Sequence, residues 1–506
     1  MATTSAPIVP SASPYAAEDS KNIERKITYH RAVDMDNRSN KDEAALESDL
    51  SDQEQPKEFK EGGYGWVVVL TVFLINMHTW GLNSAYAVFL AYYLSSDVFP
   101  GSTAIDFAFV GGLSISIALL FAPLATIVIG KFGTRVCLQI GVVLETAAFV
   151  GASFTSQIWH LILSQGICFG AGMGFLFTGS VGLIPQWFTR KRSLANAMGS
   201  AGSGFGGLTY SLAANALITN LGLAWAFRVL AIVAFAINAI CSFLARDRNK
   251  EVGAVHQAFH KELFKKVELY LFLAWGFFSV LGYIIVVFSL ADYASAVGYT
   301  ATQGSILAAM FNLSQGLGRP VIGYYSDKIG RINVAALSTL IASLAAFFLW
   351  IFAGEHYAGA IVYSLFGAFA GCIWPCVAPV AAEIIGLQLL PSAMSITWLV
   401  LVLPATFAEV IGLSLVRSGK NGYLHVQVYT GFMFLAAFIF LWLLRILKMH
   451  TWDVEAREAE VRRQDSCNTE SAAAAAAATG GQKISVVDSR LSLAYAFRAC
   501  FTVTNV

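Results

Sequence analysis

Long apolar runs alternate with short polar loops between residues 64 and 447 of this chain. Each run has about 20 residues or more, the length at which an α-helix crosses a bilayer. Twelve spans are predicted, at residues 64–92, 106–129, 135–153, 158–184, 194–218, 224–244, 267–291, 302–325, 332–353, 357–382, 391–416 and 424–447. The pattern therefore predicts an all-α membrane protein with twelve transmembrane helices.

The longest polar loop, residues 245–266, divides the predicted spans into six and six. We therefore expect an N-terminal six-helix half over 61–244, a connector over 245–266 and a C-terminal six-helix half over 267–447. Residues 1–60 are rich in Ser, Asp, Glu and Lys and cannot bury enough apolar surface to fold. They predict a disordered N-terminal tail, and residues 448–506 predict a second tail, mostly disordered.

Composition excludes several classes of function. The chain is 56% hydrophobic and 13% charged, whereas soluble domains have roughly 25% charged residues. A net charge of +1 without a clustered basic face argues against nucleic-acid binding. The seven cysteines lie in or beside apolar spans and in the tail, which indicates neither a disulfide framework nor a metal site. The motifs of ATP-driven pumps and of membrane hydrolases do not occur, so we expect neither an enzyme nor a cofactor.

Basic residues are distributed unevenly among the loops. With a cytoplasmic N-terminus, the inner loops carry Lys131, Arg135, Arg190, Lys191, Arg192, Arg246, Arg248, Lys250, Lys261, Lys265, Lys266, Lys328 and Arg331. The outer loops carry only Arg417 and Lys420. This asymmetry obeys the positive-inside rule and predicts that both termini are cytoplasmic. The plasma membrane is the expected location, and the vacuolar or another internal membrane is the alternative.

Two motifs resemble signatures of the monocarboxylate transporter family, a branch of the major facilitator superfamily. The first begins the first span and reads Glu61-Gly62-Gly63-Tyr64-Gly65-Trp66, with Tyr64 as its single departure. The second, at the entrance of the fifth span, includes Phe188 and Arg192. The resemblance covers roughly residues 61–447. It implies the major facilitator fold and a secondary transporter of a monocarboxylate or related organic anion that works by alternating access.

A loop between spans 8 and 9 resembles the G-x-x-x-D-x-x-G-R loop of the superfamily. It runs from Gly323 through Asp327 to Arg331, and a degraded copy with Lys131 and Arg135 lies between spans 2 and 3. The acid is expected to cap a helix or hold a basic partner as the halves rock, so these five residues are the predicted gating residues. The alternative is a basic turn that serves topology alone.

Polar residues inside the spans are the candidates for substrate binding, because each is costly in a membrane. Arg319 matches in position the arginine that binds the substrate carboxylate in members of the family, and the alternative is a structural partner to a carbonyl or carboxylate. A guanidinium suits this task since its planar fork pairs with a carboxylate through two hydrogen bonds and keeps its charge. Asn83, Asn312 and Gln315 complete the predicted substrate site.

Departures from the family bear on proton coupling. Gln315 occupies the place of an aspartate in mammalian-type members, and Ser84, beside Asn83, occupies the place of a lysine. Coupling then moves to another titratable residue, with Glu409, Glu145 and His78 as the candidates. Alternatively the protein is a uniporter, an importer or exporter of a larger compound, as in fungal-type branches with riboflavin or secondary metabolites, or a non-transporting sensor on the same fold. An accessory membrane subunit is left open.

Overall fold

Helices make up nearly all of the regular structure, as the apolar runs predict. The computed structural model describes residues 61–96, 98–417, 419 and 421–475. No β-strand lies among these described residues. The predicted tail over 1–60 and the residues from 476 onwards fall outside them. In hydrocarbon each backbone N–H and C=O has to be paired within the protein, and a helix pairs them within one segment.

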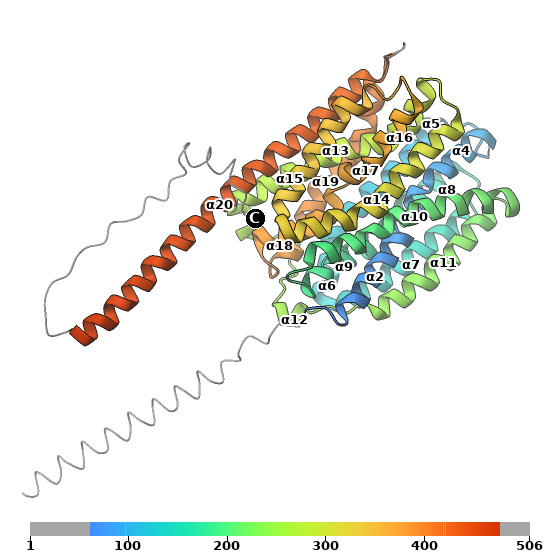
Figure 1. The fold of residues 1–506 in the computed structure, drawn as a ribbon. Coiled ribbons are helices and arrows are strands. Elements are labelled where there is room, and N and C mark those ends of the chain that lie inside the picture. Colours follow the sequence, from blue (N-terminus) through green and yellow to red (C-terminus); the bar gives the residue numbers. More distant parts are fainter. Residues whose placement is uncertain (1–60, 97, 418, 420, 476–506) are drawn as a thin grey trace, which may run out of the picture. The chain divides into compact units, whose positions relative to one another are not determined.

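The N-terminal half follows the first six predicted spans (Figure 1). Its helices are α2 (Gly65–His78), α3 (Trp80–Ser84), α4 (Tyr86–Ser96), α5 (Ala104–Leu120), α6 (Ala122–Phe132), α7 (Thr134–Ala152), α8 (Ile158–Leu161), the π-helix η1 (Ile162–Cys168), α9 (Phe169–Val181), the short η2 (Ile184–Gln186), α10 (Arg192–Leu221) and α11 (Leu223–Leu244). The first span and the fourth are therefore each built from several successive helical segments.

The C-terminal half follows a connector that holds α12 (Asn249–Val252) and η3 (Lys261–Lys265). Its helices are α13 (Val267–Ala296), α14 (Ala301–Ile329), α15 (Arg331–Ala345), η4 (Ala346–Trp350), α16 (Tyr357–Leu365), α17 (Gly367–Ala370), α18 (Ile373–Ile385), α19 (Leu390–Leu415) and α20 (Leu424–Ala475). The last helix continues well beyond the predicted end of its span at residue 447.

Nine helices in the described part of the chain are long and apolar enough to cross a membrane, or ten if the bent pair Phe109–Leu120 and Ala122–Phe132 is one span. Neither α10 nor α14 is among them, although they have 30 and 29 residues. At about 1.5 Å per residue both are long enough to cross a bilayer. Their low hydropathy reflects a content of Gly, Ser and Asn that packing between the halves explains.

The two helices α10 and α14 run side by side at the boundary between the halves (Figure 1). A Cβ atom on Gly204 of α10 would lie 2.6 Å from the backbone nitrogen of Gly316 on α14, so no larger residue fits there. Small residues let helices approach closely in a membrane, where van der Waals packing replaces the hydrophobic effect. The glycine-rich composition thus serves the contact between the two halves.

The turns α6–α7 and α14–α15 occupy matching places in the two halves. Each contains a glycine with positive φ, Gly133 at 89° and Gly330 at 111°. Glycine adopts this conformation without the steric penalty that a Cβ atom causes. The internal repeat in the sequence therefore corresponds to the same backbone turn.

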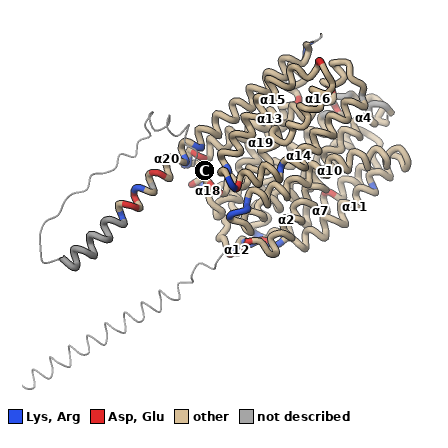
Figure 2. The backbone as a smooth tube through the Cα atoms, viewed as in Figure 1, with Lys and Arg blue, Asp and Glu red and all other residues tan. Residues whose placement is uncertain are grey.

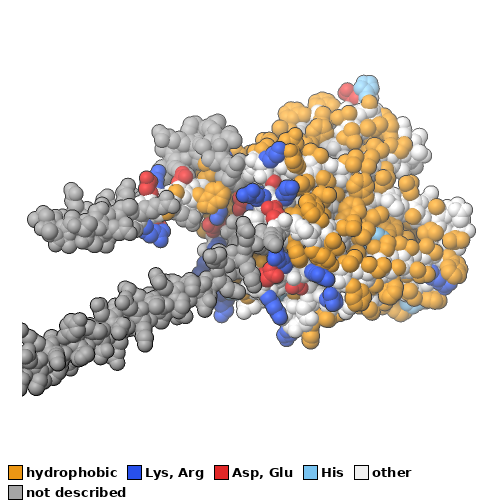
Figure 3. Space-filling model, turned by 60° about the horizontal axis from the view of Figure 1, so that its bottom comes forward, with side chains coloured by type: hydrophobic (Ala, Val, Ile, Leu, Met, Phe, Trp, Pro, Cys, Tyr) orange, Lys and Arg blue, Asp and Glu red, His pale blue; other side chains and the backbone are white. Residues whose placement is uncertain are grey.

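Charged residues of the described part gather at one end of the helices (Figure 2). We call this the basic end. The α6–α7, η2–α10, α11–α12 and α14–α15 connections and the helix ends beside them hold its basic residues Lys131, Arg135, Arg190, Lys191, Arg192, Arg246, Arg248, Lys328 and Arg331. Beside it, a broad surface is covered with hydrophobic side chains (Figure 3). Leu212 and Phe348 are 68% and 66% exposed, as expected of side chains that contact lipid.

Candidate functional site

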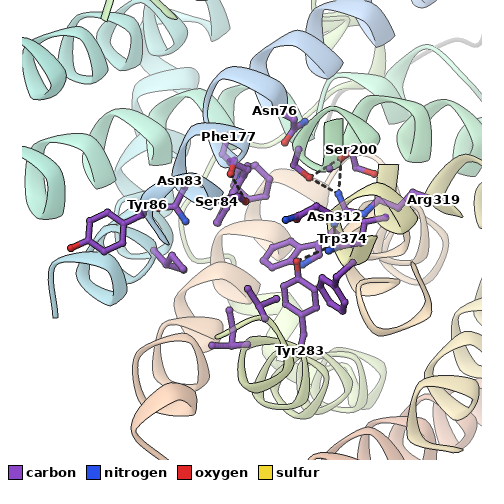
Figure 4. A pocket seen from close by; sticks show the side chains of 18 of the residues that line it. Asn76, Asn83, Ser84, Tyr86, Phe177, Ser200, Tyr283, Asn312, Arg319 and Trp374 are labelled. Atoms are coloured by element: carbon purple, nitrogen blue, oxygen red, sulfur yellow. Dashed lines mark hydrogen bonds between the residues drawn. The ribbon is translucent and has the colours of Figure 1, made fainter. Parts of the chain in front are cut away.

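A cavity lies between the two halves, and its walls come from α2, α3, α4, α5, α9, α10, α13, α14 and α18 (Figure 4). Its volume, counted as the space open to the centres of water molecules, is about 170 Å³. The four residues predicted to bind substrate, Arg319, Asn83, Asn312 and Gln315, all line it. The structure thus brings these four together, and their role in binding stays a prediction.

Arg319 is the charged residue of this wall, and its side chain reaches across the boundary between the halves. From α14, its Nη1 donates hydrogen bonds to the carbonyl oxygen of Ser200 at 2.7 Å and to Oγ of Ser203 at 2.6 Å, both on α10. Its Nη2 donates to Oε1 of Gln315. The same oxygen accepts a hydrogen bond from the hydroxyl of Tyr283 at 3.0 Å. The guanidinium therefore links α14, α10 and α13.

The charge of Arg319 has no acidic counterpart in the cavity. The residue is 2% exposed, and none of the lining residues is Asp or Glu. No salt bridge within the described ranges involves it, and its buried Nε has no hydrogen-bond partner there. Burying an ionised group is costly unless it is paired, and arginine does not lose its proton. The cavity is therefore suited to an anion.

Four aromatic side chains form a second feature of the cavity, which we call the aromatic wall: Trp80, Phe177, Tyr283 and Trp374. The ring centroids of Trp80 and Trp374, from opposite halves, are 5.4 Å apart. Sequence reasoning missed this wall. Its members come from four helices, and an aromatic residue within an apolar span has no local signal that separates a cavity wall from lipid or core.

The three predicted proton-coupling residues do not line the cavity. Glu145 is buried in the N-terminal half, where its Oε2 accepts a hydrogen bond from Nδ2 of Asn238 at 2.7 Å. His78 is also buried, with its Nδ1 at 2.8 Å from the carbonyl oxygen of Leu74. Glu409 is partly buried on α19. Of the three, Glu409 is thus the least enclosed.

Predicted gating residues meet the opposite half at the basic end. The carboxylate of Asp327 accepts hydrogen bonds from the backbone N–H groups of Ser193 at 2.9 Å and Leu194 at 2.8 Å, in the first turn of α10. Arg331 donates to the carbonyl oxygen of Thr189 at 2.7 Å. A Cβ atom on Gly323 would lie 2.7 Å from the carbonyl oxygen of Ser193, so the glycine permits this approach.

The remaining charges of the two loops have different surroundings. Arg331 also forms ion pairs with Glu383 at 3.0 Å and with Asp327 at 3.7 Å. In the degraded copy, Arg135 donates to the carbonyl oxygen of Phe243 at 3.4 Å, within the same half, and Lys131 is exposed. The two copies of the loop therefore do not make equivalent contacts.

The two signature motifs contact each other although they are far apart in the sequence. The carboxylate of Glu61 accepts a hydrogen bond from the N–H of Lys191 at 2.6 Å, and the rings of Trp66 and Phe188 lie 5.0 Å apart. Arg192 donates from Nε to the carbonyl oxygen of Phe188 at 2.9 Å. Gly62 and Gly63, which follow Glu61 in the first motif, have positive φ values of 91° and 59°. The motifs fasten the start of α2 to the start of α10.

Comparisons with known proteins agree with this architecture. The profile of the Major Facilitator Superfamily matches residues 68–290 and 271–503. The probable transporter MCH2 of Saccharomyces cerevisiae is 34% identical over 445 residues, which is 86% of this chain and 93% of MCH2. The uncharacterized transporter ESBP6 of the same yeast is 31% identical over 404 residues, which is 76% of this chain and 59% of ESBP6.

A solved structure shares the fold. The E. coli fucose:proton symporter FucP, in its outward conformation, has a TM-score of 0.60 and 14% identity, and the likeness covers 75% of this chain and 99% of FucP. At this identity the likeness concerns the fold alone, and it confirms the predicted fold class.

Proposed function

Because the chain belongs to the major facilitator superfamily and is a secondary transporter rather than an enzyme, we propose that it carries an organic monocarboxylate by alternating access. The observation that carries this proposal is Arg319, a buried cation on the wall of the central cavity without an acidic partner among the described residues. The two signature motifs, which resemble those of monocarboxylate transporters, support the same substrate class.

A carboxylate fits the edge of the guanidinium that Gln315 occupies only in part. Nε and Nη2 lie on one edge of the planar group, and Nε has no partner within the described part of the chain. A carboxylate that accepts from this edge supplies both the missing charge and the missing hydrogen bond, in the bidentate geometry that arginine favours. In doing so it competes with Gln315 for Nη2.

Binding at Arg319 also affects the contact between the halves. The guanidinium donates to Ser200 and Ser203 of the other half, so a carboxylate that draws it away weakens those bonds. Alternating access requires that substrate binding bias the rocking of one half against the other. We infer that this exchange of partners is part of that bias, and that the basic end faces the cytoplasm of a cell whose plasma membrane holds the protein.

The test is uptake into liposomes, with the purified protein and labelled lactate, pyruvate, acetate and riboflavin at two pH values. We expect Arg319→Ala to lose at least tenfold in transport at equal incorporation, and Arg319→Lys to retain little, because a point charge does not replace bidentate pairing. Arg228→Ala is the matched control, since Arg228 lies over the rings of Phe154 and Trp225 and not on the cavity.

Normal carboxylate transport by Arg319→Ala would show that Arg319 does not bind the substrate. Riboflavin transport without carboxylate transport would favour the larger-substrate alternative. Binding without transport of any compound would favour the sensor.

We further propose that proton coupling, where it occurs, uses Glu409. This acid is only partly buried on α19, whereas Glu145 and His78 are enclosed in the N-terminal half. Glu409→Gln should lose accumulation driven by a pH gradient and keep substrate exchange, because exchange needs no net proton movement. If the variant still accumulates substrate on a pH gradient, the coupling residue lies elsewhere.

A further inference from the structure

The aromatic wall faces the same cavity as Arg319. Trp80 and Phe177 belong to the N-terminal half, and Tyr283 and Trp374 to the C-terminal half. Their ring centroids lie 5.2 Å apart for Trp80 and Phe177, and 6.0 Å apart for Tyr283 and Trp374. With the 5.4 Å contact of Trp80 and Trp374, the rings form one continuous series across the boundary between the halves.

Gln315 connects the aromatic wall to the guanidinium of Arg319 through hydrogen bonds. Oε1 of Gln315 accepts from both Arg319 and the hydroxyl of Tyr283 (Figure 4). The ring of Tyr283 then leads to that of Trp374. A molecule whose carboxylate is bound at Arg319 therefore has aromatic side chains beside the rest of its body.

The cavity has room for more than one small group. Its volume of about 170 Å³ open to the centres of water molecules is several times the roughly 10–15 Å³ that holds one water. Water beside aromatic carbon is readily displaced by an apolar group, and that displacement favours binding. The space between Arg319 and the aromatic wall is thus suited to an apolar body attached to the carboxylate.

We propose that the substrate is a planar aromatic or conjugated monocarboxylate, whose carboxylate binds Arg319 while its ring packs against Trp374 and Trp80. This inference rests on the proposed function and specifies its substrate class. Aromatic rings prefer offset-stacked or edge-to-face contacts with other rings, and such contacts favour an aromatic ring over a saturated one of similar size by about tenfold at most. The rings of Trp80 and Trp374 lie 5.4 Å apart, so in this proposal the ring of the substrate contacts both, one from each half.

The experiment separates the ring from the charge. Isothermal titration calorimetry with the full chain in detergent measures Kd for benzoate, cyclohexanecarboxylate, benzamide and cyclohexanecarboxamide. The aromatic acid should bind about fivefold to tenfold more tightly than the saturated acid, and the acids should bind more tightly than the amides. The first ratio tests the ring, and the second tests the carboxylate of the proposed function.

Substitutions locate the effect on the aromatic wall. Trp374→Leu and Trp80→Leu should each bring the ratio of the two acids close to one, whereas Trp374→Phe should keep most of it. Because both acids are measured on the same preparation, loss of folded protein does not alter the ratio. Trp225→Leu is the matched control, since Trp225 is 54% exposed on α11, away from the cavity.

Two results would overturn the inference. One is equal or tighter binding of the saturated acid to the unmodified protein, which indicates an aliphatic substrate. The other is an unchanged ratio in both leucine variants, which places the ring elsewhere. If the amides bind as well as the acids but the aromatic amide is still preferred, the proposed carboxylate fails and the aromatic preference stands.

Discussion

At the basic end, two turns in matching places of the two halves reach the opposite half by different means. The α14–α15 side uses an acid latch, in which Asp327 accepts from two N–H groups of α10. Before the α6–α7 turn, the corresponding position holds Gly130, in α6. Here a connector latch contacts α19 and the residues just before it instead: Val255 donates its N–H to the carbonyl oxygen of Gln388 at 2.8 Å, and Ser392 donates its hydroxyl to the carbonyl oxygen of Val255 at 3.1 Å.

Both latches act at helix N-termini that lack caps of their own. Neither Lys191 before α10 nor Leu389 before α19 makes a side-chain cap hydrogen bond. The first turn of a helix carries unpaired N–H groups and a partial positive charge. At α10, an acid from the opposite half meets both needs, whereas the connector bonds to the carbonyl oxygen of Gln388 and the hydroxyl of Ser392, which are neutral groups. The acid latch is therefore expected to be the stronger, since hydrogen bonds to charged groups contribute about 1.5–3 kcal/mol and neutral ones about 0.5–1.5 kcal/mol.

Removing the charge of the acid latch is the change with the largest expected effect. Asp327→Asn keeps the shape of the side chain but not its charge, so the state closed at the basic end loses roughly 1.5–3 kcal/mol. The open fraction should then rise between about tenfold and a hundredfold. Spin labels at positions 191 and 329 measure the separation of the two halves directly, and transport turnover should slow more than substrate binding weakens.

Asp247→Asn is the control, because Asp247 is an exposed acid of the connector that accepts a hydrogen bond from the N–H of Asn249 at 3.4 Å and is not part of the acid latch. An unchanged distance distribution in Asp327→Asn would leave this loop as a turn without a gating role.

The sequence predicts much of the acid latch, but it does not predict the connector latch. The repeated loop marks Asp327 and Arg331, but nothing in the pattern identifies the N–H groups of α10 that Asp327 binds. The connector latch uses the backbone of Val255 and the absence of a side chain at Gly130, which leave no pattern of residue types. Backbone contacts over long sequence distances depend on the folded arrangement alone.

In the cavity, too, the sequence predicts some of the residues that act together and not others. Arg319, Gln315 and Asn312 lie on one helix at spacings that share a face, so the sequence predicts that they act together. The aromatic wall joins residues of four helices, and only the packed halves bring them together. The sequence predicts twelve helical spans, and nine or ten helices of the described residues are long and apolar enough to cross a membrane. The glycine-rich α10 and α14 are long without being strongly apolar.

Adding one methyl group at Gly130 tests whether the connector replaces the missing acid. A Cβ atom there would lie 2.8 Å from Cβ of His256 and 3.1 Å from its carbonyl oxygen, so the connector has to shift. At the low end of the range for overpacking, about 1–1.4 kcal/mol, Gly130→Ala should open the α6–α19 side about fivefold to tenfold. Labels at positions 131 and 388 report the opening.

The double variant Gly130→Ala with His256→Gly should recover most of the closed state, since it removes the shorter of the two contacts. Gly112→Ala is the control, because no atom lies within 4 Å of a Cβ at that glycine of α5. If Gly130→Ala behaves like Gly112→Ala, the connector does not hold this side closed.

The smallest expected effect is a pH dependence confined to the connector latch. Burial lowers the pKa of His256 below its ordinary value, while the carbonyl of Ala254 and the carboxylate of Asp247 oppose the shift. The closed state therefore binds the proton less well than an open state in which the ring is solvated and titrates near about pH 6.5. The latch is intact above that pH and weakens as the pH falls through it. Between about pH 7.5 and about pH 5.5, the open fraction seen by labels at 131 and 388 should rise by less than in Gly130→Ala, and His256→Gln should remove the rise. The same rise in His256→Gln would assign the pH dependence to another group, and the distinction between the two latches would then rest on Asp327 and Gly130 alone.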